Sequence, residues 1–158
     1  MIKLLALLSL FIPVFAGERV FQLPDHHTLL IHELTAVCKK SSHIEIITPT
    51  FNHSALKKDF LIRAQKGSLI SLVVNNPQGD PLSMVQYENI NLYTYPYPLV
   101  QTVVMIDNSL VCTLDGAFEE ENLGSEKHLM RCSDNQQKIA FIKQSMLPIF
   151  KRSKPYLK

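Results

Sequence analysis

The apolar run Leu69–Val74 leaves little choice of structure for the first half of this chain. It is short and near-continuous, and it lies between Gly67 and the turn-forming residues 75–81. A run of this kind is typical of a strand that is buried on both faces of a sheet. Residues 44–47 are short, β-branched and flanked by Ser and Pro, so they predict a second strand.

Between these two runs the sequence predicts a helix with Asn52 as its N-cap and Gly67 at its C-terminal end. Leu56, Phe60 and Ala64 fall on one face of this helix. A strand–helix–strand unit places two parallel strands side by side, with the helix packed across them. The first half of the chain therefore predicts parallel strands.

Two more helices are expected, one that opens at Pro24 and Asp25 and one that closes the chain after the capping-box spacing of residues 133–136. Their apolar positions are Leu30, Ile31, Leu34, Val37 and Cys38 in the first, and Ile139, Ile142, Met146 and Ile149 in the second. Further strands are expected at residues 89–93, 102–106, 110–113 and 128–132, with a hairpin turn at 107–109. With 158 residues and 46% apolar content, the chain predicts one α/β domain over residues 17–158, with a mixed sheet flanked by helices.

The first 16 residues have the pattern of an export signal. Lys3 supplies a positive charge, residues 4–15 are apolar, and residues 14–16 form a small-residue cleavage motif before Gly17. The apolar stretch is shorter than the roughly 20 residues that a spanning helix needs. The alternatives are an uncleaved anchor and a buried helix. We expect an exported mature protein, periplasmic or secreted, with no transmembrane segment.

Export permits a disulfide between two of the three cysteines, Cys38, Cys112 and Cys132. Cys112 and Cys132 fall on predicted strands of the same half, so they are the expected pair. Cysteines that are simply buried as small apolar groups are the alternative. The sequence shows no Cys/His pattern at metal-ligand spacing, so neither a metal nor a cofactor is expected.

The order of the elements resembles the small, single-motif branch of the phospholipase D superfamily, the bacterial endonuclease type. The segments that carry the resemblance are residues 44–51, 55–56, 64–67, 72–74, 104–107, 116–118 and 125–126, followed by the closing helix. It covers nearly the whole mature chain. The resemblance implies a phosphodiesterase fold in which one histidine attacks phosphorus, a second protonates the leaving oxygen and lysines balance the phosphoryl charge. It also implies a homodimer, because two single-motif chains must pair.

The His-x-Lys-x4-Asp signature of that family is degenerate in this chain. The resemblance places Val100 at the histidine, Thr102 at the lysine and Asp107 at the aspartate. Valine cannot attack phosphorus, and threonine carries no positive charge. The loss of one oxyanion-stabilising donor alone costs about 10²–10³ in rate. Asp107 is also a residue type that ordinary turns favour. The alternation of residues 100–104 predicts a core strand, in which side-chain packing has replaced the catalytic chemistry of the family.

Two later features of the family have also changed or lost their purpose. The usual Gly-Ser-x-Asn element corresponds here to Gly116-Ala117-Phe118-Glu119, which lacks the hydroxyl and the amide. Glu126 matches the acidic residue that orients the catalytic histidine. His128 is the candidate for a displaced nucleophile, because it lies two residues from Glu126 and is expected to share a strand face with it. The other five histidines are expected to be surface or satisfied core groups.

Candidate binding residues come from a tyrosine–proline run and a basic tail. Tyr93, Tyr95 and Tyr97 lie just before the altered motif, where they could stack on bases or on a lipid headgroup. A rigid linker whose rings pack on the sheet is the alternative. Lys151 and Arg152 begin the basic tail, although the formal charge of +2 is too small by itself to indicate nucleic-acid or membrane binding.

We therefore favour a non-catalytic exported protein that keeps the phospholipase D-like scaffold to bind DNA or another phosphodiester, or to assemble. The alternative is an active phosphodiesterase, of nuclease or phospholipase type, whose missing groups come from His128 or from a partner chain.

Overall fold

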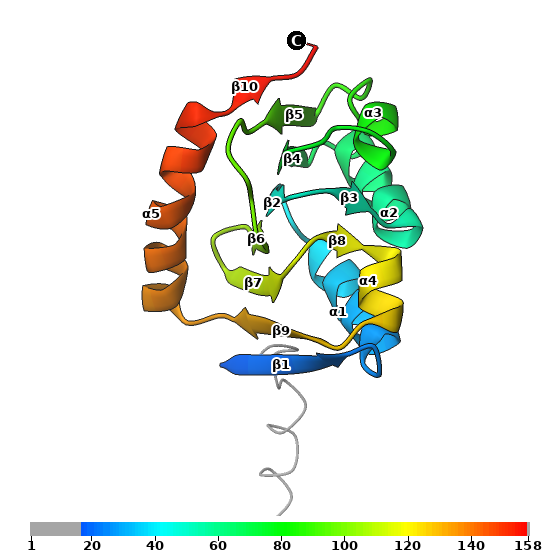
Figure 1. The fold of residues 1–158 in the computed structure, drawn as a ribbon, viewed down its shortest axis with the longest axis vertical. Coiled ribbons are helices and arrows are strands. Elements are labelled where there is room, and N and C mark those ends of the chain that lie inside the picture. The colour runs from blue at the N-terminus through cyan, green and yellow to red at the C-terminus, as the bar shows by residue number, and fades with distance from the viewer. Residues whose placement is uncertain (1–16, 158) are drawn as a thin grey trace, which may run out of the picture.

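An eight-stranded mixed sheet runs through the middle of the protein (Figure 1). The computed structural model describes residues 17–157. The strand order is β1-β9-β7-β6-β2-β4-β5-β10. The strands are β1 (Glu18–Leu23), β2 (His43–Thr48), β4 (Leu69–Val74), β5 (Ile90–Thr94), β6 (Gln101–Ile106), β7 (Leu110–Asp115), β9 (His128–Ser133) and β10 (Lys154–Pro155). Strands β2, β4 and β5 are parallel neighbours, and the other pairs are antiparallel. The expected α/β domain with a mixed sheet is confirmed.

Helices cover both faces of this sheet (Figure 1). The first face carries α1 (His27–Cys38), α2 (Ser54–Gln65), α3 (Asp80–Met84) and α4 (Glu120–Ser125), and the second carries α5 (Gln136–Arg152). Successive side chains of a strand point to opposite faces. Leu72 and Val104 therefore join the core under α1 and α2, while Val73 and Met105 join a smaller core under α5. Burial on both faces explains the near-continuous apolar sequence of β4.

The N-terminal part of the fold differs from the sequence prediction. Strand β1, which the prediction lacks, pairs antiparallel with β9 at the sheet edge. Helix α1 begins at His27 rather than at Pro24 and Asp25, because the backbone after β1 first makes a turn in which His26 N donates to Gln22 O (2.8 Å) and His27 N donates to Pro24 O (3.0 Å).

Two helix caps also differ from their predicted positions. The N-cap of α2 is His53, whose ring accepts a hydrogen bond from Leu56 N, whereas Asn52 belongs to the short strand β3 (Phe51–Asn52). Strand β3 pairs in parallel with β8 (Phe118–Glu119), outside the main sheet. The N-cap of α5 is Asn135, which accepts from Lys138 N at 3.0 Å, because the preceding strand continues to residue 133.

Cys112 and Cys132 lie opposite each other on β7 and β9 and form a disulfide. Cys38 is buried in the first core as a free thiol. Burial, together with the nearby charge of Asp59, raises the pKa of the Cys38 thiol to about 12. Cys38 is therefore protonated and unreactive at neutral pH.

Within residues 17–157 no helix is long and apolar enough to cross a bilayer. The expected export signal, residues 1–16, lies outside the described residues.

Candidate functional site

The three positions of the altered motif lie in three different environments. Val100 precedes β6 and is 78% exposed, so the prediction that it packs in the core is wrong. Its position is at the end of the sheet, where Gly116 N donates to Val100 O at 3.0 Å. Thr102, on β6, is fully buried. Asp107 lies in the turn between β6 and β7. No nucleophile and no cation occupies the two positions at which the family resemblance calls for them.

Thr102 takes part in a chain of hydrogen bonds that ties β2, β6 and β8 together. Phe118 N donates to Thr48 Oγ1 at 3.0 Å, and Thr48 Oγ1 lies 2.8 Å from Thr102 Oγ1. Thr102 Oγ1 in turn donates to Gly116 O at 2.8 Å. Each hydroxyl has one proton, so the two protons are shared among three acceptors: Thr50 O, Gly116 O and the other threonine's oxygen. The position of the expected catalytic lysine thus holds a structural hydroxyl.

This chain of hydrogen bonds predicts that removal of the Thr48 hydroxyl lowers stability more than removal of the Thr102 hydroxyl. Thr48→Val is expected to lower the free energy of unfolding by about 1–3 kcal/mol, because the buried amide of Phe118 loses its partner. Thr102→Val is expected to cost about 1 kcal/mol, since the Thr48 hydroxyl can turn to Thr50 O, 2.8 Å away. Urea denaturation of both variants measures the difference. Equal losses would show that the Phe118 amide finds another partner when Thr48 is replaced.

Asp107 has a structural role in this fold. Its Oδ1 accepts hydrogen bonds from Ser42 N (2.9 Å) and His43 N (2.8 Å), which lead into β2. Both Asp107 and Asn108 have φ of 52°, as the tight turns favoured in β-hairpins require. The carboxylate therefore connects the hairpin to the start of the neighbouring strand.

Glu119 stands where the resemblance expects an amide, and it also serves the local structure. Its Oε1 accepts a hydrogen bond from Thr50 Oγ1, which ties β8 to the residue directly before β3. Ala117 precedes this strand and offers no hydroxyl.

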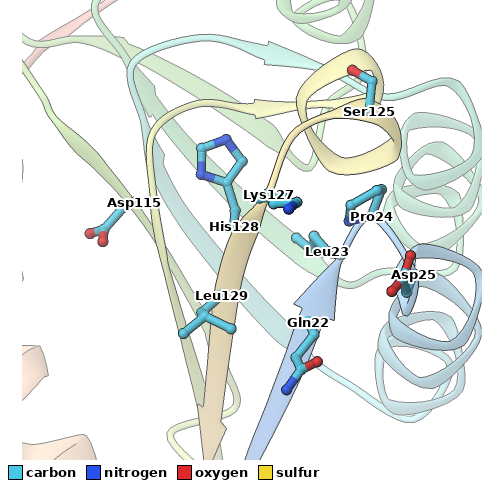
Figure 2. Close-up of a pocket in the computed structure, with 9 residues that line it drawn as sticks. All are labelled: Gln22, Leu23, Pro24, Asp25, Asp115, Ser125, Lys127, His128 and Leu129. Atoms are coloured by element: carbon cyan, nitrogen blue, oxygen red, sulfur yellow. The ribbon is translucent and has the colours of Figure 1, made fainter.

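His128 and Glu126 come together as the sequence suggests, although not from one strand. Glu126 follows α4, and His128 begins β9. Their Nε2 and Oε2 atoms are 3.0 Å apart, and the His128 side chain is 24% exposed. His128 lines a pocket of about 570 Å³, which Figure 2 shows between the ends of β1, β7 and β9. Asp25, Asp115 and Lys127 line it as well. A carboxylate that holds one imidazole nitrogen leaves the other free to accept a proton.

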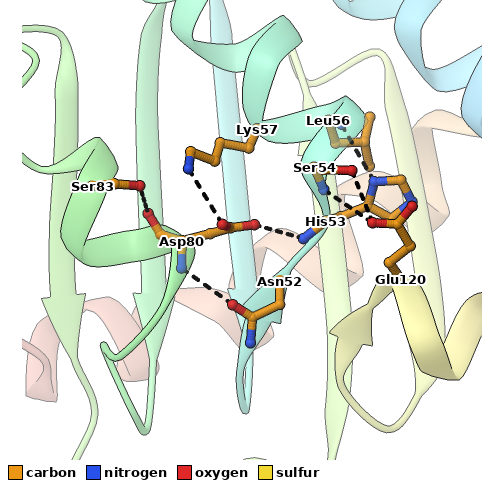
Figure 3. A network of polar contacts seen from close by, with 8 residues as sticks. All are labelled: Asn52, His53, Ser54, Leu56, Lys57, Asp80, Ser83 and Glu120. Atoms are coloured by element: carbon orange, nitrogen blue, oxygen red, sulfur yellow. Dashed lines mark hydrogen bonds and ion pairs between the residues drawn. The ribbon is translucent and has the colours of Figure 1, made fainter.

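A second histidine pair was not recognised in the sequence. His27 Nε2 and His53 Nε2 are 3.1 Å apart and join α1 to the start of α2. Around them, Asp80 accepts from His53 N at 2.8 Å, and Glu120 accepts from the Ser54 hydroxyl at 2.9 Å (Figure 3). The signal available was a histidine directly before a helix, but its partner lies 26 residues away. Among residues 17–157 no group of three or more His, Cys, Asp or Glu side chains could hold a metal ion.

Because the His53 imidazole is buried, we expect the folded protein to lose stability in mild acid. Its burial lowers its pKa below the ordinary 6.5, so below about pH 6.5 the unfolded chain takes up a proton that the folded chain does not. Stability from this group is complete above pH 6.5 and is lost as the pH falls toward the lowered pKa. We expect the Tm of the wild type to fall between pH 7.5 and 5.5, and that of His53→Asn, which keeps a capping oxygen, to fall less. His32→Asn, at an exposed position, is the control.

The three tyrosines do not act together. The Tyr93 ring packs edge-on against Phe150 of α5, at 6.1 Å, in the smaller core. Tyr95 and Tyr97 form an edge-to-face pair at 5.6 Å, and Tyr97 is 55% exposed. These two rings and Lys154 line a pocket of about 540 Å³. Lys151 and Arg152 are exposed at the C-terminal end of α5, close along the chain to Lys154.

The fold has clear counterparts among solved structures. NucT from Helicobacter pylori superposes with a TM-score of 0.79 at 15% identity, over 88% of this chain and 98% of that chain. Nuc from Salmonella typhimurium, a phospholipase D family member, gives 0.74 at 14% identity, over 90% and 99%. TrmBL2, an archaeal chromatin protein, gives 0.66 at 11% identity, over 94% and 57%. No protein-family model and no curated protein sequence matches the chain. The structural likeness shows that this chain has the phospholipase D fold, in the small form that NucT and Nuc share.

Proposed function

We propose that this protein binds nucleic acid through the end of α5 and the residues after it, and does not cleave the phosphodiester. The observation that carries the proposal is an uneven distribution of charge. Residues 150–158 contain four lysines or arginines and no aspartate or glutamate, whereas residues 1–135 have an excess of acidic residues. A cationic segment with no acidic neighbour along the chain suits a polyanion.

Two further observations support binding without cleavage. The positions of the family's nucleophile and cation hold an exposed valine and a buried threonine that is committed to hydrogen bonds. The same fold also occurs in an archaeal chromatin protein whose structure shows a mode of DNA binding. This chain matches 57% of the length of that protein.

Salt dependence tests the proposal, because each phosphate contact releases counterions. We expect the affinity for a fluorescent single-stranded DNA oligonucleotide to fall about twentyfold between 50 and 200 mM salt, as three neutralised phosphates predict. Replacing Lys151, Arg152 and Lys154 together with alanine should remove most of this slope. Lys39, Lys40 and Lys66 are exposed at the ends of α1 and α2, and their triple alanine variant is the matched control. Absence of binding at low salt would exclude the proposal.

Phosphodiester hydrolysis by a displaced histidine is the second candidate, because His128 has a carboxylate partner and an adjoining pocket. The assay is nicking of supercoiled plasmid and hydrolysis of a generic phosphodiester by the wild type and by His128→Ala. We expect neither protein to cleave. Cleavage by the wild type that His128→Ala abolishes would establish the enzyme instead.

We also propose that the protein is exported from the cytoplasm. We further propose that it forms a homodimer. The disulfide supports an oxidising compartment, and the first 16 residues have the pattern of an export signal. Val100 and Phe141, 78% and 72% exposed, border an apolar groove of about 420 Å³ that a second copy could cover. N-terminal sequencing from cell fractions tests export. Sedimentation equilibrium of the wild type and Phe141→Ser tests the dimer.

A further inference from the structure

We propose that the tyrosine loop, residues 95–98, holds an unpaired base, so that the nucleic acid bound is single-stranded. The inference rests on the proposed function and adds the class of ligand. The loop has the sequence Tyr-Pro-Tyr-Pro and connects β5 to β6. With Lys154 it makes up most of the lining of an open pocket of about 540 Å³, a volume that can take one nucleobase and its sugar.

Asn75 fixes the shape of this loop. Its Nδ2 donates to Tyr95 O at 3.0 Å and to Tyr97 O at 2.7 Å, and its Oδ1 accepts from Leu99 N at 2.8 Å. One side chain thus satisfies three backbone groups of the loop. Proline at positions 96 and 98 restricts the backbone further. A loop that is ordered before binding loses little conformational entropy when a ligand arrives.

The two rings offer a stacking surface beside a positive charge. Tyr95 is half-buried and supports Tyr97 edge-to-face at 5.6 Å, which leaves the Tyr97 ring 55% exposed. Lys154 lies on β10, which pairs with β5 directly before the loop. No acidic residue is among those that line the pocket in the described part of the chain.

This combination discriminates between single and double strands. Aromatic side chains stack on any unpaired base, while a cation nearby binds the phosphate. In a duplex the faces of the bases are already stacked on one another, so the Tyr97 ring has nothing to contact. The cations after residue 150 would still attract a duplex, but only through charge.

The experiment compares a 15-nucleotide single strand of thymidine with a 15-base-pair duplex in the same buffer. We expect the single strand to bind about tenfold more tightly. Tyr97→Ala should weaken single-strand binding about tenfold and leave duplex binding unchanged, whereas Tyr97→Phe, which keeps the ring, should retain the affinity. The chain has no tryptophan, so quenching of its tyrosine fluorescence gives an independent signal of stacking.

The outcomes separate the two proposals. If neither oligonucleotide binds, the proposed function fails. If both bind equally and Tyr97→Ala changes neither affinity, while the Lys151, Arg152 and Lys154 variant loses both, nucleic-acid binding stands and the tyrosine pocket is overturned. Asn75→Ala adds a check on positioning: it should weaken single-strand binding and leave the salt dependence as it is.

Discussion

Replacing Phe51 with alanine is expected to lower the free energy of unfolding by about 3–5 kcal/mol. Phe51 is fully buried and lies between two other rings, with centroids 5.9 Å from Phe60 and 5.8 Å from Phe118. The ring planes of Phe51 and Phe118 differ by only 3°. Alanine would leave a cavity at the junction of α2, β3 and β8, where rings from three elements meet and cannot all move inward.

Urea denaturation of the oxidised protein measures this effect. Phe51→Leu is the matched control, because it keeps most of the volume and should cost less than about 1.5 kcal/mol. A loss below about 1 kcal/mol for Phe51→Ala would mean that the aromatic layer collapses easily and contributes little. The layer also bears on the altered motif, since Phe118 supplies the amide that starts the hydrogen-bond chain to Thr102.

Removing the disulfide through Cys112→Ala and Cys132→Ala together is expected to cost about 3 kcal/mol. The two cysteines are 20 residues apart, and a loop of that length loses about this much conformational freedom in the cross-linked unfolded chain. The measurement is the urea midpoint of the wild type and the double variant, each with and without dithiothreitol. Reductant should bring the wild type to the level of the variant and leave the variant unchanged. If the variant had the same urea midpoint as the oxidised wild type, the hydrogen bonds between β7 and β9 would be enough to hold these strands together without the disulfide.

The elements that the sequence predicts well are those whose pattern is local. Strand β4 occurs where its apolar run predicts it, and helix α2 follows its spaced apolar residues. Strands β3 and β8 have two residues each, and they exist because each pairs with the other, 67 residues away along the chain. Helices α3 and α4 have five and six residues, too few for a periodic pattern to identify.

In the candidate site, too, local sequence patterns do not predict the contacts between residues that are far apart along the chain. The family resemblance placed Thr102 at the right strand, but its hydrogen-bond partners lie 54 and 14 residues away, so no spacing rule identifies them. The error at Val100 has a simple cause. Alternation predicts which face a side chain takes, but not whether the strand has yet entered the sheet, and β6 begins one residue later. The pair His27 and His53 was missed because one member begins α1 and the other caps α2, 26 residues later.

The short strand β10 has a consequence for how copies of this protein behave at high concentration. A sheet that ends in a long unpaired strand offers its free amides and carbonyls to the same strand of another molecule. Here Lys154 and Pro155 pair with Thr94 and Tyr93, and Tyr156 N donates to Leu92 O at 2.8 Å, so the backbone of β5 is covered. What remains outermost is a charged side chain and a residue that has no amide hydrogen to donate. This edge of the sheet is thereby closed to strand-by-strand growth into aggregates.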